Sequence, residues 1–151
     1  MILIDTNALL ILIIGQIDTR LIDTHKRTSI YEEQDYYDLL DIIGSVENLL
    51  VLPNVWTEVD NLLNNFSGNQ KYQYIIEITQ IIKLTSEKFI TSIEAVNSHS
   101  FFDLGLTDSL LLSLAKECKL LITTDSALSD YAIASGIKVY DIVKNRNLRL
   151  N

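Results

Sequence analysis

Short apolar runs of strand length alternate with segments of helical periodicity along the whole chain, and this alternation constrains the fold more than any other feature. The runs are Ile2–Ile4, Leu49–Leu52, Leu120–Thr123 and Ile137–Tyr140. Each is too short for a helix and is bounded by polar or turn-forming residues, which is typical of buried strands. Strands that alternate with helices favour right-handed crossovers and a parallel sheet covered on both faces. We therefore expect an α/β fold with a parallel β-sheet and flanking helices.

The segments between these runs carry apolar residues at helical spacing. We expect helices over 6–17, 31–43, 53–66, 70–84, 86–97 and 126–134, and a further helix that Thr107 caps and that extends to Cys118. The single proline, Pro53, suits the first turn of a helix, where its missing N–H does no harm. With 151 residues and no low-complexity linker, the sequence predicts one domain over 1–151.

Composition limits the cellular setting and the available chemistry. The one cysteine, Cys118, follows apolar residues and is expected to be a buried structural thiol, and two histidines are too few for a histidine-rich metal site. The apolar run 8–14 is far shorter than the ~20 residues that span a bilayer, and no basic residue precedes it as in a secretory signal. We expect a cytoplasmic protein without a membrane segment.

The net charge of −8 disfavours broad, nonspecific binding of nucleic acid, because affinity for phosphates comes mainly from Lys and Arg. Basic residues do cluster at 25–27 and at Lys144, Arg146 and Arg149. A solvated loop and a frayed terminus explain these clusters at least as well as contact with a substrate does. Divalent cations bound by acids would also cancel part of the negative charge.

Two of the expected strands run directly into an aspartate. ILI leads into Asp5, and LLITT leads into Asp125. In open parallel sheets the ligand crevice lies outside the carboxyl ends of the strands. If the first and fourth strands are neighbours, the two carboxylates converge there.

Two further acids occupy related positions. Asp108 is expected in the first turn of the helix before the fourth strand, and Glu58 lies early in the helix after LLVL. Alone, Asp108 is explained as a partner of the helix dipole and Glu58 as part of a solvated face. Together with Asp5 and Asp125 they favour a site for Mg²⁺ or Mn²⁺, which prefer oxygen ligands. A metal held in this way activates water and neutralises charge on a phosphate, which suits hydrolysis of a phosphodiester.

The sequence resembles the PIN-domain family at four places that together cover essentially the whole chain. These are ILIDTNALL, PNVWTEVDNLL, LGLTDSLLLSLAKE and LLITTDSAL. The resemblance implies a three-layer α/β/α fold and Mg²⁺- or Mn²⁺-dependent endonucleolytic cleavage of single-stranded RNA. Many small members of the family are toxins held inactive by an antitoxin protein, often as homodimers.

The resemblance also implies roles for particular residues of this sequence. The acids of the family correspond to Asp5, Glu58, Asp108 and Asp125, and its supporting polar residues correspond to Asn7 and Thr123. The expected metal ligands are Asp5, Asp108 and Asp125. Residues 19–31 and 86–97 match nothing in the family. Asp103 is expected to be a loop acid and Asp60 a solvated neighbour of Glu58.

Other functions remain open at this point. A haloacid-dehalogenase-type phosphatase requires an acid two residues after the first aspartate, where this chain has Asn7. A receiver domain requires a phosphoacceptor aspartate at the end of a later strand, and LLVLP has none. A non-catalytic PIN-fold module that binds a protein partner suits the acidic composition. The acids do not themselves discriminate between RNA and DNA.

Overall fold

The computed structural model describes all residues, 1–151, and its centre is a sheet of five parallel strands in the order β3-β2-β1-β4-β5. The strands are β1 (Ile2–Ile4), β2 (Leu49–Val51), β3 (Ser86–Glu87), β4 (Leu120–Thr123) and β5 (Val139–Asp141). Every neighbouring pair is parallel. The expected α/β fold with a parallel sheet is confirmed.

The strand order places the direction change of the chain between β1 and β4. The chain moves from β1 to β2 and β3 on one side, then crosses back to β4 and continues outward to β5. Ile4 pairs with Ile122, and the backbone N–H of Asp5 donates to the carbonyl of Ile122. The residues that follow β1 and β4 therefore emerge side by side at the carboxyl edge.

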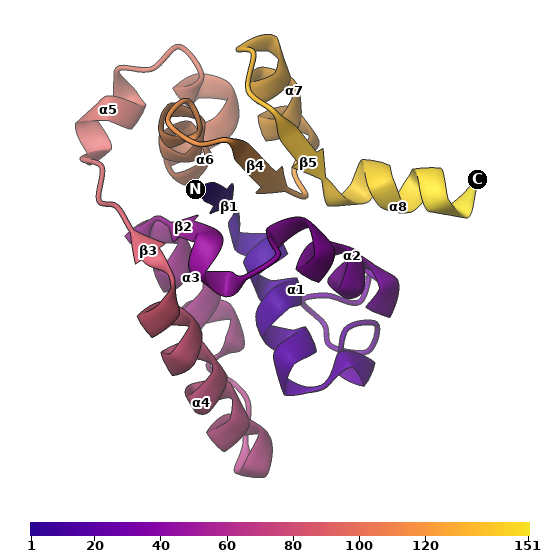
Figure 1. The fold of residues 1–151 in the computed structure, drawn as a ribbon. Helices are drawn as coiled ribbons and strands as arrows, with labels where there is room; N and C mark the ends of the chain where they lie inside the picture. The colour runs from indigo at the N-terminus through magenta and orange to yellow at the C-terminus, as the bar shows by residue number, and fades with distance from the viewer.

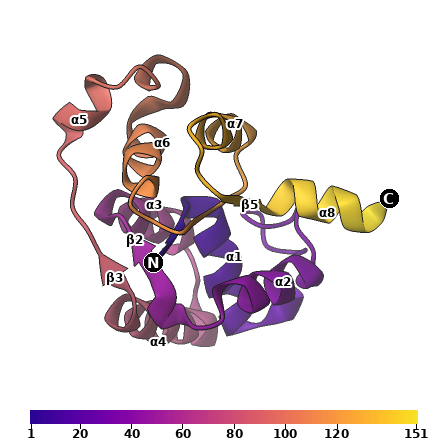
Figure 2. The same ribbon diagram turned by 45° about the horizontal axis from the view of Figure 1, so that its top comes forward.

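Helices cover both faces of the sheet (Figures 1 and 2). One group comprises α1 (Thr6–Ile17), α2 (Glu33–Ile43), α3 (Pro53–Leu63) and α4 (Gly68–Leu84). The other comprises α5 (Ser92–Val96), α6 (Phe101–Ala115) and α7 (Ser126–Ala134), while α8 (Ile142–Leu150) extends from the end of β5. Two 3₁₀ turns, η1 (Thr19–Leu21) and η2 (Val46–Asn48), lie in the connections.

The core is one continuous cluster of 39 buried apolar residues, and α1 is its central helix. Every residue of α1 from Ala8 to Gly15 is buried, which explains why this helix is apolar on all sides. A Cβ at Gly15 would lie 2.2 Å from the ring of Tyr36, so the close approach of α2 to α1 requires glycine here. None of the helices has the length and apolarity needed to cross a bilayer.

Residues 86–97 do not form the single helix that their pattern predicts. Ser86 and Glu87 pair with Leu50 and Val51 as an edge strand, and only α5 is helical. The prediction was wrong because the exposed edge of β2 offers backbone hydrogen bonds that local periodicity does not reveal. The last strand is also displaced, to β5 instead of 137–140.

The expectation that Thr107 caps a helix is wrong. The helix α6 begins at Phe101 and is interrupted at Gly105, whose φ of 78° and ψ of −170° are not helical. Thr107 therefore lies in the turn that follows the interruption, and its hydroxyl binds a side chain elsewhere. Asp103 lies in the first turn of α6, not in a loop. Cys118 is half-buried, with its thiol directed at the carbonyl of Leu114 (3.5 Å).

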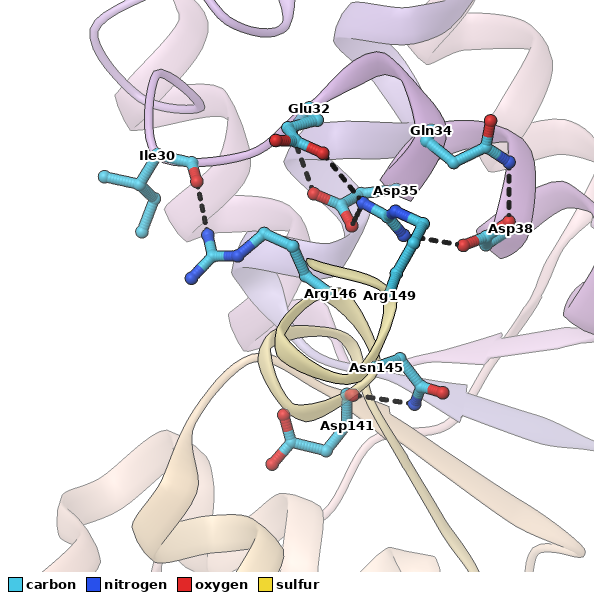
Figure 3. A network of polar contacts seen from close by, with 9 residues as sticks. All are labelled: Ile30, Glu32, Gln34, Asp35, Asp38, Asp141, Asn145, Arg146 and Arg149. Carbon is cyan, nitrogen blue, oxygen red and sulfur yellow. Dashed lines mark hydrogen bonds and ion pairs between the residues drawn. The ribbon is translucent and has the colours of Figure 1, made fainter. Parts of the chain in front are cut away.

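The C-terminal residues form a helix, not a frayed tail. Asp141 caps α8 by accepting a hydrogen bond from the backbone N–H of Lys144 (3.0 Å). Near the other end of α8, the guanidinium of Arg149 binds Glu32, Asp35 and Asp38 of the α2 region (Figure 3). The interpretation of the basic C-terminal cluster as solvated is therefore wrong for Arg149.

Candidate active site

Asp5 is held in a fixed position where β1 meets α1. Its Oδ1 accepts a hydrogen bond from the backbone N–H of Ala8 (2.9 Å), so the carboxylate caps α1. Its Oδ2 accepts from the hydroxyl of Thr123 (2.5 Å) and the backbone N–H of Thr124 (2.9 Å). The side chain is 95% buried, and burial raises the pKa of Asp5 although these hydrogen bonds oppose the rise.

Asp125 occupies the equivalent position where β4 meets α7. Its Oδ1 accepts from the backbone N–H of Leu128 (2.8 Å) and caps α7. Its own N–H donates to the Thr123 hydroxyl (3.0 Å), the same hydroxyl that donates to Asp5. One threonine thus joins the two strand-ending aspartates, which lie next to each other as the strand pattern predicts. Asp125 differs from Asp5 in being exposed.

Glu58 reaches the same edge of the sheet from α3. The hydroxyl of Thr6 donates to its Oε2 (2.6 Å), and the hydroxyl of Thr107 donates to its Oε1 (2.6 Å). Neither threonine was recognised from the sequence as part of the site. Thr6 directly follows Asp5 and Thr107 directly precedes Asp108, and this adjacency was the available signal.

Asp108 lies on α6 and is half-buried. Burial is the main cause that raises the pKa of Asp108 to about 7, and the charges of Asp125, Asp5 and Glu58 raise it further. No ion pair of the structure involves any of these four acids. The carboxylates therefore repel one another without a lysine or arginine to compensate them.

The site opens into a shallow hollow of about 480 Å³ lined by Glu58, Leu104, Leu106, Thr107 and Asp108. A second hollow of about 380 Å³ adjoins it on the α3 side of Glu58. Leu104 and Leu106 of this lining flank the helix interruption at Gly105, whose positive φ is readily adopted only by glycine. Glu58 and Asp108 thus border a surface that an extended ligand can reach, whereas Asp5 and Asp125 line neither hollow.

The remaining predicted residues have different surroundings. Thr123 contacts Asp5 directly, whereas Asn7 lies at an exposed position in the first turn of α1. Asp60 is exposed and accepts a hydrogen bond from the hydroxyl of Tyr74 (2.6 Å). An unforeseen neighbour is Tyr31, which is 96% buried. Burial raises the pKa of Tyr31, a hydrogen bond with Thr124 lowers it, and the charge of Asp5 raises it. Tyr31 is therefore a neighbour of Asp5 and Thr124, so the segment 19–31 ends beside the site.

The donor atoms can be compared with the requirements of a metal ion. All the candidate ligands are oxygen atoms, which suits Mg²⁺ or Mn²⁺ and disfavours a zinc site built from cysteine and histidine. No three Asp, Glu, His or Cys side chains lie close enough to hold one ion together. Mg²⁺ commonly takes only one or two carboxylates and keeps several waters, so the arrangement fits an ion with partly water-mediated contacts.

Comparison with known proteins identifies no relative of established function. No family model matches the sequence, and no curated protein sequence matches it. A solved structure, a domain of a functionally unknown protein from Methanocaldococcus jannaschii DSM 2661, is 20% identical with a TM-score of 0.43. The match covers 93% of this chain and 89% of that chain.

Proposed function

We propose that this protein is a divalent-metal-dependent endonuclease of the PIN type that hydrolyses phosphodiester bonds of single-stranded RNA in the cytoplasm. The observation that carries the proposal is the convergence of Asp5, Glu58, Asp108 and Asp125 at the carboxyl edge of β1 and β4. They come from four separate segments, and no basic side chain is paired with them. Such a group is costly for a fold unless a cation binds it.

The chain would hold Mg²⁺ or Mn²⁺ through Asp5, Asp108 and Asp125, with at most two of these carboxylates in direct contact and the rest reached through water. A bound divalent ion supplies activation of a water molecule and neutralisation of charge on the phosphate. Thr123 and the N–H of Thr124 keep Asp5 oriented, which is the role of outer-shell partners in metal sites. Glu58, whose carboxylate is fixed by Thr6 and Thr107, would orient the attacking water from the α3 side.

The choice of RNA as substrate, an antitoxin-like protein partner and a homodimeric state rest on the resemblance to PIN domains. Hydrolysis by metal-activated water needs no 2′-hydroxyl, so the site chemistry is equally suited to DNA. The net charge of −8 makes substrate binding depend strongly on the cation. Substrate preference is therefore a separate question from the existence of catalysis.

The proposal is tested by incubating the purified protein with short single-stranded RNA and DNA, first with Mn²⁺ and then with excess EDTA. We expect cleavage of RNA that requires Mn²⁺ and stops with EDTA. Calorimetric titration with Mn²⁺ is run in parallel. Mn²⁺ binding without cleavage of either strand would indicate a non-catalytic module, and cleavage of DNA alone would correct the substrate. Absence of Mn²⁺ binding would overturn the metal site.

A further inference from the structure

Arg146, near the middle of α8, differs from the other basic side chains of this acidic chain. Twelve Lys and Arg residues are present and four of them form ion pairs, which leaves eight without an acidic partner. Seven of these eight are exposed, and their side chains make no hydrogen bond. Arg146 alone is half-buried, and its guanidinium donates to the backbone carbonyl of Ile30 (Figure 3). The fold therefore holds this one unpaired cation in a defined place.

The next arginine of the same helix is surrounded differently. Arg149 binds Glu32, Asp35 and Asp38, so these acids are already engaged. Arg146 has only the Ile30 carbonyl, which occupies one of the five N–H donors of a guanidinium. A partly buried charge is costly without a partner of opposite charge. An anion from outside the chain would supply that partner.

Arg146 lies toward the same edge of the sheet as the carboxylates. Asp141, which ends β5 and caps α8, pairs with Thr123 of β4. Neighbouring strands are ~4.8 Å apart, and the helical rise places the backbone of Arg146 ~8 Å further along α8 from Asp141. A single strand of nucleic acid can therefore contact both Arg146 and the carboxylate site.

Tyr31 lies close to both Arg146 and the carboxylates. It directly follows Ile30, whose carbonyl Arg146 binds, and it is 96% buried. Burial is the main cause that raises the pKa of the Tyr31 phenol, the charge of Asp5 raises it further, and the charge of Arg146 lowers it. The two charges thus act on one phenol, yet Arg146 forms no ion pair with Asp5 or any other acid. The cation is near the candidate metal site without neutralising it.

We propose that Arg146 binds a backbone phosphate of the substrate strand, close to the phosphate that is attacked at the carboxylates. The inference rests on the proposed nuclease function and adds to it the position of one substrate contact. The planar guanidinium still has N–H groups free for two oxygens of one phosphate, which is the geometry that arginine offers to this anion. A contact of this kind carries no sequence information but sets the register of the strand on the site.

The test measures binding of a fluorescently labelled single-stranded RNA in Mn²⁺, in an Asp108→Asn background that prevents cleavage. Adding Arg146→Gln should weaken binding about 3- to 10-fold and reduce the salt dependence by about one phosphate contact. Adding Arg146→Lys keeps the charge and should retain the salt dependence. The matched control is Lys138→Gln, which removes an exposed, unpaired cation beside the amino end of β5 and should change neither quantity.

RNA in which one linkage at a time is an uncharged methylphosphonate locates the contact. In the Asp108→Asn background, affinity should fall when a linkage near the cleaved bond loses its charge. Once Arg146→Gln is added, the same methylphosphonate should cost nothing further, because the two interacting groups have already been separated. Equal costs with and without Arg146 at every linkage would overturn the proposal.

Kinetics in the otherwise wild-type chain provide another readout. Arg146→Gln should raise KM and leave kcat unchanged, because the contact is made equally in the ground and transition states. Unchanged RNA affinity and salt dependence in Arg146→Gln, with Mn²⁺-dependent cleavage intact, would overturn the phosphate contact and leave the nuclease proposal standing. Equal losses of affinity in Arg146→Gln and Arg146→Lys, with unchanged salt dependence, would also overturn it, because Arg146 would then only support Ile30. Absence of RNA cleavage in the wild type would overturn the nuclease proposal itself, and the inference with it.

Discussion

Two groups of acids in this molecule differ in what surrounds them. On α2 and just before it, Glu32, Asp35 and Asp38 all bind the guanidinium of Arg149 at 3.0, 2.9 and 2.8 Å (Figure 3). At the carboxyl edge of β1 and β4, Asp5, Glu58 and Asp125 receive hydrogen bonds only from threonine hydroxyls and backbone N–H groups, and the carboxylate of Asp108 receives none. The first group contains its own cation and the second does not.

The protonation behaviour follows this difference. Hydrogen bonds to Asp35 and Glu32 hold the pKa of Arg149 above its ordinary value, so this guanidinium stays charged. Burial and the neighbouring acids raise the pKa of Asp108 to about 7. A cluster of acids paired with an arginine fastens one helix to another. We call such a cluster compensated. An uncompensated cluster at the edge of a parallel sheet can still attract a cationic ligand.

The largest expected effect is the loss of catalysis when an acid of the uncompensated group is removed. Asp108→Asn should reduce Mn²⁺-dependent cleavage at least ~100-fold, because a metal site contributes several kcal/mol to transition-state stabilisation. Initial rates on single-stranded RNA measure it. The matched control is Asp38→Asn, which removes an acid from the compensated cluster and should leave kcat unchanged. Equal losses of cleavage activity in Asp108→Asn and Asp38→Asn would contradict the distinction between the two groups of acids.

Replacing Arg149, the cation of the cluster on α2 and α8, should lower the free energy of unfolding. Arg149→Met leaves Asp35, whose side chain is 1% exposed, without its charged partner, so we expect a loss of about 2–3 kcal/mol in the free energy of unfolding. Chemical denaturation at pH 7 measures the change. The control is Arg20→Met, which breaks a fully exposed pair with Asp18 and should change the free energy of unfolding little, because solvent screens such pairs. A cost for Arg149→Met no larger than that for Arg20→Met would contradict the distinction.

Stability of the metal-free protein should fall as pH rises from about 4 towards 7. The pKa of Asp108 is about 7 when folded against an ordinary value of 3.8, so the native state holds the extra proton between these values. Stability is therefore lost as pH increases from about 4 to 7, by about 1–2 kcal/mol after allowance for solvent screening. Asp108→Asn should remove this decline and raise the melting temperature at pH 8.

Asp125→Asn should also raise the melting temperature without metal, since asparagine still caps α7 and one repelling charge disappears. Thermal scans in EDTA at pH 5 and pH 8 measure both variants. A lowered melting temperature in either variant at pH 8 would mean that the acids are already compensated. Added Mn²⁺ should stabilise the wild type more than either variant.

The smallest expected effect concerns the threonines that fix Glu58. Thr107→Val keeps the shape of the side chain and removes one hydrogen bond, which is worth about 1 kcal/mol, so kcat should fall about 5- to 10-fold. Thr6→Val should act in the same way. Thr57→Val, on the same helix as Glu58 but exposed, serves as the control. Wild-type kcat in both Glu58-linked variants would exclude a positioning role.

Much of the fold could be predicted because it depends on local patterns. Apolar runs that end in Asp5 and Asp125 mark strands whose carboxyl ends carry acids, and the parallel alternation places those ends on one edge. The fully apolar stretch of α1 marks a helix buried on all sides. The two aspartates converge only if β1 and β4 are neighbours in the sheet, and the pairing of Ile4 with Ile122 shows that they are.

The rest depended on contacts between distant segments. The pairing of β3 with β2, the docking of α8 on α2 and the contacts of Thr6 and Thr107 with Glu58 join residues 36 to 117 positions apart. No periodicity encodes such partners, because each segment would satisfy its own pattern equally well elsewhere. The interruption of α6 at Gly105 was missed for a related reason, since the apolar pattern of α6 begins only beyond it.

By itself, the sequence determined a parallel α/β fold and an excess of acids at the ends of its strands, since strand periodicity and chain direction are local properties. Only the tertiary structure decided which acids receive an arginine and which do not. The reason is physical: charge compensation acts across space between side chains that the order of residues does not bring together.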